Sequence, residues 1–183
     1  MPKPSSVIAL VEDERHEMLV RRYLRRSGIE GRQVRFERSP SGQGSAEQWV
    51  RSNFAREVSA YRNRQARAAT ALIVMIDADA HTVQGRLTQL SEGLEEGGIQ
   101  AVGSAEHIAR LVPRRNVETW ISSLNGRSVD EVTDYKPTRN DWNDFIPQAA
   151  NVLFDWARPA AVLPAHCVDS LRSGLSEIHR LGF

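Results

Sequence analysis

Two carboxylates follow an apolar run near the middle of the chain. Residues 71–76 are all apolar, and they lead directly into Asp77-Ala78-Asp79. A run this short is typical of a strand buried on both faces of a parallel sheet, and open α/β sheets bind ligands at the carboxyl ends of their strands. Residues two apart in an extended segment point the same way, so Asp77 and Asp79 could bind one hard cation such as Mg²⁺ or Mn²⁺. Alternatively, Asp77 caps the next helix and Asp79 is an exposed turn residue.

Two glutamates have similar positions after other apolar segments. Glu12 follows residues 7–11, and Glu118 comes shortly after residues 108–112. The carboxyl ends of parallel strands lie at one edge of a sheet, so we expect both glutamates near Asp77, with Glu118 as the candidate for a second metal ion. Carboxylates this close repel one another without a cation, which raises their pKa values. Alternatively, Glu118 only complements the dipole of the helix that it begins.

Basic residues are concentrated in the first part of the chain. Residues 1–70 contain 14 Lys and Arg against 8 Asp and Glu, although the net charge of the whole chain is only +1. Arg51 and Arg56 belong to an arginine-rich stretch in this part, and Arg115 and Lys136 could neutralise a substrate phosphate. This distribution favours a surface that binds nucleic-acid phosphates. An ordinary solvated arginine face would give the same pattern.

The elements that must position these residues alternate along the chain. Apolar segments predict strands, and apolar residues spaced three and four apart predict the helices between them. The resulting order β-α-β-α-β-α-β indicates an α/β fold with a mostly parallel, Rossmann-like sheet and helices on both faces. The predicted strands are residues 7–11, 33–37, 70–77 and 108–112. The first predicted helix ends near Arg26, and the second starts at the capping box of residues 45–48 and includes Tyr61. The third runs from Val83 to the Gly97-Gly98 pair, and the fourth is capped by Asn116 and includes Leu124.

The last third of the chain is predicted to be helical. Residues 126–146 are polar and weakly patterned, and Pro147 is expected to open a helix that runs to Trp156. Apolar residues at 168, 171, 175 and 178 predict a final amphipathic helix before Gly182. We therefore expect an α/β core over residues 1–125 and a helical extension over residues 126–183, packed as one domain.

Composition excludes several classes of protein. No apolar run approaches the roughly 20 residues of a membrane span, and Met1-Pro2-Lys3-Pro4 lacks the apolar segment of a secretory leader. The single cysteine, Cys167, rules out an internal disulfide and a cysteine-rich zinc site. A cytoplasmic location without membrane attachment is the simplest expectation.

The first strand and helix resemble those of a response-regulator receiver domain. Val11-Glu12-Asp13-Glu14 follows a strand and precedes a helix that ends Arg-Arg-Tyr-Leu-Arg-Arg. A receiver has its phosphoacceptor aspartate some forty residues later, but residues 50–65 here form an arginine-rich helix. A receiver also has a lysine after its fifth strand, whereas Lys136 follows no clear strand. A receiver-like phosphoacceptor domain is therefore only an alternative.

The stronger resemblance is to the Toprim family of topoisomerases, primases and overcoming-lysogenization-defect nucleases. The family signature is a glutamate that ends the first strand and an Asp-x-Asp that ends a later one, which Glu12 and Asp77-Ala78-Asp79 match. Residues 112–120, Val-Pro-Arg-Arg-Asn-Val-Glu-Thr-Trp, resemble a segment of small standalone Toprim-like proteins. Two positions depart from the family pattern. Asp13 stands where glycine is usual, and His16 stands where nuclease members often have an acid.

This resemblance implies a metal-dependent nuclease or nickase that hydrolyses phosphodiester bonds in DNA or RNA. It implies that Asp77 and Asp79 bind the main Mg²⁺ or Mn²⁺, and that Glu12 completes its shell or acts as a general base. Related nucleases carry an ATPase domain, whereas this chain has no P-loop, so a separate ATPase in a phage-defence system is a further hypothesis. The alternative from another class is a non-catalytic subunit, monomeric or homo-oligomeric, that binds nucleic acid or protein.

Overall fold

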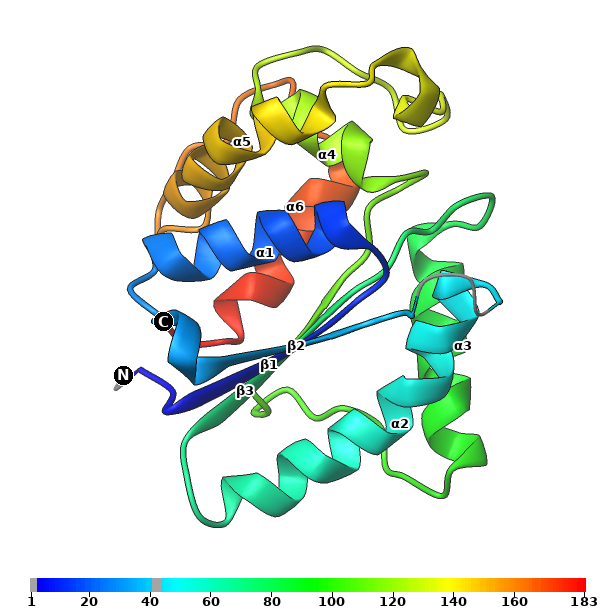
Figure 1. The fold of residues 1–183 in the computed structure, drawn as a ribbon, viewed down its shortest axis with the longest axis vertical. Coiled ribbons are helices and arrows are strands. Elements are labelled where there is room, and N and C mark those ends of the chain that lie inside the picture. Colours follow the sequence, from blue (N-terminus) through cyan, green and yellow to red (C-terminus); the bar gives the residue numbers. More distant parts are fainter. Residues whose placement is uncertain (1–2, 41–43) are drawn as a thin grey trace.

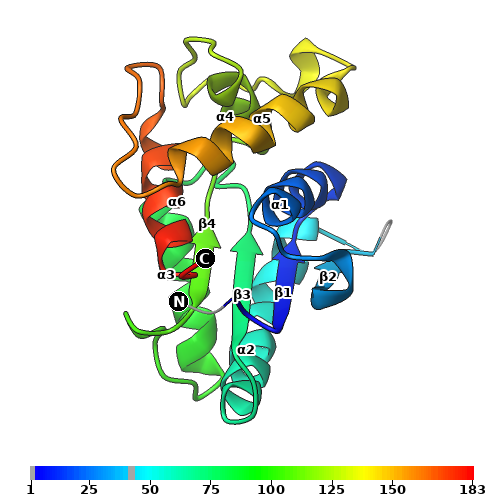
Figure 2. The same ribbon diagram turned by 90° about the vertical axis from the view of Figure 1, so that its left-hand side faces the viewer.

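A four-stranded parallel sheet forms the centre of the molecule (Figure 1). The computed structural model describes residues 3–40 and 44–183, so the middle of the turn-rich loop after the second strand lies outside the described residues. Figure 2 shows the strands side by side, and their order is β2-β1-β3-β4. This sheet confirms the predicted α/β fold. The strands are β1 (Ser6–Val11), β2 (Val34–Arg38), β3 (Thr70–Met75) and β4 (Ile108–Leu111).

Helices cover both faces of the sheet, as Figure 1 shows. One face packs against the second and third helices, and the other face packs against the remaining four. The helices are α1 (Glu14–Arg26), α2 (Ala46–Gln65), α3 (Val83–Glu96), α4 (Val117–Leu124), α5 (Trp142–Trp156) and α6 (Asp169–His179). Short 3₁₀ turns occupy Gly31–Gln33 and Lys136–Thr138.

β3 is buried along its whole length because both of its faces are covered. Side chains alternate along a strand, so Ala71, Ile73 and Met75 enter the core under α1, α4, α5 and α6. Leu72 and Val74 enter the second core, under α2 and α3. This double burial explains why the segment is a continuous apolar run rather than an alternating one.

The C-terminal helices complete one of the two cores. α5 packs along α1, and α6 packs against β4. α5 begins at Trp142, so the prediction that Pro147 opens this helix is wrong: Pro147 lies inside it. Trp142 and Ile146 are four residues apart and both fully buried, and their burial offsets the one backbone hydrogen bond that a proline cannot donate.

No helix in the described parts of the chain is both long enough and apolar enough to span a membrane.

Candidate functional site

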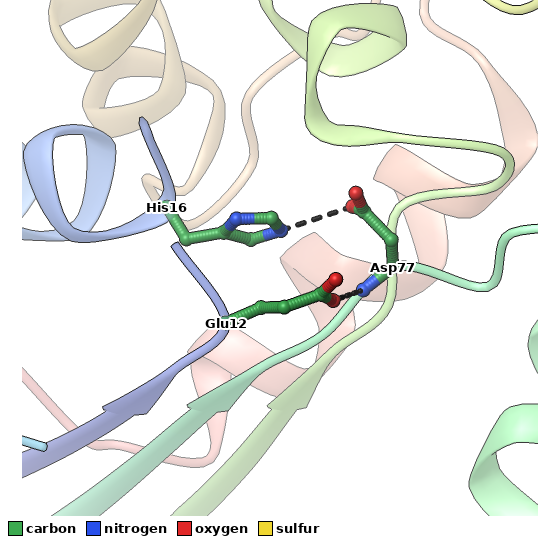
Figure 3. A group of neighbouring side chains, drawn as sticks. All are labelled: Glu12, His16 and Asp77. Carbon is green, nitrogen blue, oxygen red and sulfur yellow. Dashed lines mark hydrogen bonds and ion pairs between the residues drawn. The ribbon is translucent and has the colours of Figure 1, made fainter. Parts of the chain in front are cut away.

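A cluster of three side chains occupies the carboxyl-terminal edge of the sheet (Figure 3). Glu12 directly follows β1, Asp77 lies just beyond β3, and His16 belongs to the first turn of α1. One ligand atom from each of the three lies within 4.8 Å of the others. The Glu12 carboxylate also accepts a hydrogen bond of 3.0 Å from the Asp77 backbone N–H, which ties the ends of the two central strands together.

His16 is completely buried between two aspartates. Its Nε2 lies 2.9 Å from Asp77 Oδ1, and its Nδ1 lies 2.8 Å from Asp13 Oδ1. The same Asp13 oxygen accepts the backbone N–H groups of Arg15 and His16, so Asp13 is also the N-cap of α1. The cap therefore fixes the orientation of the imidazole, and the imidazole faces Asp77.

Burial in the cluster disfavours the charged forms of Asp77 and Glu12. Burial raises the pKa of Asp77 to about 7, with smaller contributions from the nearby charges of Glu12 and Glu118. Burial also raises the pKa of Glu12. Both shifts indicate that a proton or another cation stabilises these carboxylates in the folded protein.

The pKa values of His16 and of its N-cap partner Asp13 are shifted in opposite directions. Burial alone would lower the pKa of His16, but the charge of Asp77 and the hydrogen bonds to both aspartates raise it well above its ordinary value. Burial opposes ionisation of Asp13, but its hydrogen bonds with His16 hold its pKa well below the usual range. Asp13 and His16 therefore form a stable ion pair.

The Asp79 side chain does not point the same way as the Asp77 side chain. Its backbone has a left-handed φ of 52°, so the extended geometry that would align the two side chains has already ended. Asp79 Oδ2 instead accepts a bond of 3.3 Å from Arg86, and the side chain is half exposed. The assignment of Asp79 as a metal ligand stays a prediction.

Arg86 of α3 fixes the loop that carries both aspartates. It is only 1% exposed, and its Nε donates a bond of 2.9 Å to the Asp77 carbonyl. Its other nitrogens contact the Ala78 carbonyl, Glu47 and Asp79. This buried guanidinium holds the backbone behind the cluster, on the side of the sheet opposite His16.

Glu118 lies near the cluster but has its own partner. It is buried in the first turn of α4 and accepts a bond of 2.6 Å from Arg15 Nη1. Its negative charge contributes to the raised pKa of Asp77. The structure therefore brings Glu12, Asp77 and Glu118 to one edge, as expected for parallel strands, but neutralises Glu118 with an arginine.

The residues proposed for phosphate binding lie in two separate places. Near the cluster, Lys136 Nζ is 4.0 Å from Asp13, and Arg115 is 3.8 Å from Asp134. Arg51 and Arg56 lie on α2, on the other side of the sheet, where they pair with Glu47 and Glu57. These interactions leave all four nucleic-acid assignments as predictions.

Sequence reasoning gave no role to Asp13 and Arg86 and left His16 unassigned. The spacing of Asp13 and His16, three apart after a strand, is a recognisable capping pattern, but contact with Asp77 joins residues 61 positions apart. Arg86 is four residues before the buried Leu90 and eight before Leu94, so its place on the buried face was visible in the spacing.

A buried cluster of two carboxylates and an imidazole could bind a metal ion. Oxygen and imidazole ligands suit Mn²⁺, Fe²⁺ or Zn²⁺, and carboxylates alone suit Mg²⁺. Comparisons of the chain with family models, with curated proteins and with solved structures found no match. The residues of the site itself therefore indicate its function.

Proposed function

We propose that this protein is a metal-dependent phosphodiester hydrolase, a nuclease or nickase acting on DNA or RNA. The observation that supports this most directly is the buried Glu12–His16–Asp77 cluster at the carboxyl edge of a parallel sheet. Ligand atoms on opposite sides of a small cation lie up to about 4.4 Å apart, twice a usual ligand distance. The ligand atoms of Glu12, His16 and Asp77 lie within 4.8 Å of one another, so only small side-chain rotations would place all three around one ion.

The residues around the cluster suit this chemistry. Glu12, His16 and Asp77 would hold the ion, and Asp13 would orient the imidazole as an outer-shell carboxylate. When bound, Mg²⁺ or Mn²⁺ stabilises charge on phosphate oxygens and lowers the pKa of a water nucleophile. The imidazole ligand favours Mn²⁺ over Mg²⁺. Glu118 and Asp79 are candidates for a second ion.

The Toprim resemblance supports the same proposal. Glu12 after the first strand and Asp77-Ala78-Asp79 after the third match the family signature, and the observed sheet is consistent with such a fold. In this proposal Arg115 and Lys136 neutralise phosphates beside the cluster. A separate ATPase in phage defence would then activate the protein, so the purified chain alone would cleave weakly. Strong unassisted cleavage would exclude that requirement.

Calorimetry with Mn²⁺ and Mg²⁺ tests the metal site. We expect binding on the order of micromolar to millimolar by the wild type, with Mn²⁺ tighter, and loss of binding by Asp77→Asn. Asp155→Asn, an exposed aspartate on α5, is the matched control and should bind normally. Cleavage of labelled DNA and RNA with each metal tests the reaction. Equal metal binding by wild type and Asp77→Asn would overturn the assignment.

A non-catalytic binding subunit is the second candidate. The observation in its favour is that the charged groups already have partners: His16 with two aspartates, Glu118 with Arg15, and Asp79 with Arg86. Such a network could serve only to hold the strand ends together. If Asp77→Asn retains full function in cells, the network is structural and catalysis is not its role.

A receiver-like role makes a different prediction. The order β2-β1-β3-β4 also occurs in receiver folds, and Asp77 ends the third strand as a phosphoacceptor would. However, Asp77 is only 4% exposed and bonded to His16. Incubation with acetyl phosphate and Mg²⁺, followed by intact mass measurement, would reveal a phosphoryl adduct on wild type and none on Asp77→Asn. We expect no adduct on either.

A further inference from the structure

The outer face of α1 carries four exposed arginines beside α5. They line a cavity of about 590 Å³ together with Met18, Pro147 and Asn151, and no carboxylate belongs to that lining. The two helices run side by side in Figure 1. The four arginines are Arg21, Arg22, Arg25 and Arg26.

Most of this positive charge is not neutralised within the protein. Arg21 pairs with Glu17 at 2.6 Å and lies over the Phe36 ring, and Arg26 lies over the Phe154 ring. Across residues 3–40 and 44–183, neither Arg22 nor Arg25 has an acidic side chain within ion-pair distance. The cavity therefore presents a concentrated positive potential.

This arrangement costs helix stability. Arg21 and Arg25, like Arg22 and Arg26, are four residues apart, and like charges at this spacing destabilise a helix by a few tenths of a kcal/mol. The helix dipole offsets the cost only in the last turn, at Arg25 and Arg26. An external polyanion would offset it for all four.

The surface formed by Arg21, Arg22, Arg25 and Arg26, here called the arginine surface, extends beyond one cavity and along the helix that carries His16. A second cavity of about 570 Å³, on the β2 side of α1, is lined by Arg21, Arg25 and Phe36 and also by one carboxylate, Glu30. Arg22 and Arg26 are six and ten residues after His16, about 9 and 15 Å along the helix axis. A nucleic-acid strand advances about 3.4 Å per phosphate, so along the helix axis these separations correspond to roughly three to four phosphates.

We propose that the arginine cavity between α1 and α5 binds the phosphate backbone of the nucleic-acid substrate; this inference rests on the proposed function and names its substrate-binding surface. The surface lies on α1 rather than on α2, whose Arg51 and Arg56 are paired with glutamates. Guanidinium groups bind phosphates sequence-independently, so the cavity would bind DNA and RNA backbones alike.

Fluorescence anisotropy with labelled single-stranded and duplex oligonucleotides in EDTA tests this inference without any metal. We compare wild type and Arg22→Ala/Arg25→Ala with Arg51→Ala/Arg56→Ala, which removes the same charge from the competing arginine surface on α2, over a salt series. The α1 variant should bind at least about tenfold more weakly near 0.1 M salt, and its log–log salt slope should be shallower by about 2, since two phosphate contacts are lost. If α1 carries the binding surface, the α2 variant should bind as wild type does, which would also reject the assignment of Arg51 and Arg56.

Three results would overturn the inference: no binding by wild type at low salt, equal losses in both variants, or a loss only in the α2 variant. Equal losses would indicate a non-specific charge effect. Because all four substitutions are in exposed or half-exposed arginines, a thermal melt should show both variants folded. Oligonucleotide binding through α1, together with metal binding that Asp77→Asn leaves unchanged, would support this surface while rejecting the metal-dependent hydrolase, so the two proposals fail separately.

Discussion

Asp77 is held in an environment that disfavours its charge. It is 4% exposed, its pKa is raised to about 7 by burial, and its hydrogen-bond partner His16 is itself fully buried. A purely structural acid in this position would be better replaced by a neutral amide. Buried acids with strongly shifted pKa values occur preferentially where a ligand or cation completes the site.

The metal-free protein should lose stability as pH rises through neutrality. The folded pKa of Asp77, about 7, lies above its ordinary value of 3.8, so protonated Asp77 stabilises the fold below pH 3.8 and this contribution is lost as pH rises to about 7. The raised pKa of Glu12 acts in the same direction. We expect the urea midpoint of wild type to fall between about pH 5 and pH 8, by on the order of 1 kcal/mol or more in unfolding free energy.

Asp77→Asn is the control for this titration. Asn cannot ionise but can still accept the bond from His16, so its pH profile should be flatter than that of wild type. The raised pKa of His16 adds stability that is also lost at high pH in wild type, whereas in Asp77→Asn the charge of Asp77 no longer raises that pKa and only Asp13 does. A wild-type midpoint that rises from pH 5 to 8 would show that the ion pair with His16 outweighs burial.

The backbone conformation at Asp79 allows a separate test of whether its carboxylate binds the metal ion. Its φ of 52° is strained for a residue with a side chain. Asp79→Gly should relieve this strain and change the unfolding free energy by less than about 1 kcal/mol despite the lost bond to Arg86, whereas Asp79→Ala should destabilise more. Urea denaturation of the three proteins measures this. If Asp79→Gly is as stable as wild type yet binds Mn²⁺ more weakly, the Asp79 carboxylate contributes to metal binding.

At the scale of elements, periodicity predicted types better than boundaries. The four strands and the helices between them follow from apolar runs and three-to-four spacing; the observed strand ends differ from the predicted ones by at most two residues, and α5 begins five residues before Pro147. The prediction at Pro147 was wrong because proline is common at the start of a helix. Burial of Trp142 and Ile146 instead places the start of α5 five residues before Pro147. Tertiary burial outweighs a single backbone preference.

Two helical glycines should respond oppositely to the same substitution. At Gly93 of α3, the nearest atom to an added Cβ lies 3.8 Å away, so Gly93→Ala should raise the unfolding free energy by about 0.5–1 kcal/mol through helix propensity. At Gly174 of α6, a Cβ would lie 2.3 Å from the Trp120 ring, and overpacking should cost about 1–3 kcal/mol. Thermal melts of the two variants measure this, and similar shifts in both would contradict the packing of α6 on α4.

At the scale of the whole molecule, residues 126–183 are part of the core. Ala149 and Leu153 of α5 and Leu171 and Leu175 of α6 belong to the same buried cluster as β1 and β3. A chain ending at residue 125 would expose this face of the sheet to water. We expect that chain to lack cooperative urea unfolding and to bind a hydrophobic dye. A cooperatively folded 1–125 fragment would show that the extension is dispensable.

The site was predicted in outline and not in detail. Strand ends of a parallel sheet share an edge, so the meeting of Glu12, Asp77 and Glu118 followed from the order of elements alone. The hydrogen-bond partners of these carboxylates could not be predicted from the order of elements. His16 contacts Asp77 across 61 positions in the chain, and Arg15 contacts Glu118 across 103. Such contacts depend on helix placement above the sheet, which periodicity does not specify.

The packing of α6 has a consequence for synthesis on the ribosome. α6 covers β4, and Ser170 accepts a bond of 2.7 Å from the Trp120 indole, so this contact needs segments about 50 residues apart. A parallel sheet already depends on contacts distant in the chain, which form slowly. Until the last helix leaves the exit tunnel, the nascent chain carries an apolar sheet face that its own residues cannot yet cover. This face of the sheet is therefore completed only after α6 has left the tunnel, and until then the growing chain is a natural client for a chaperone.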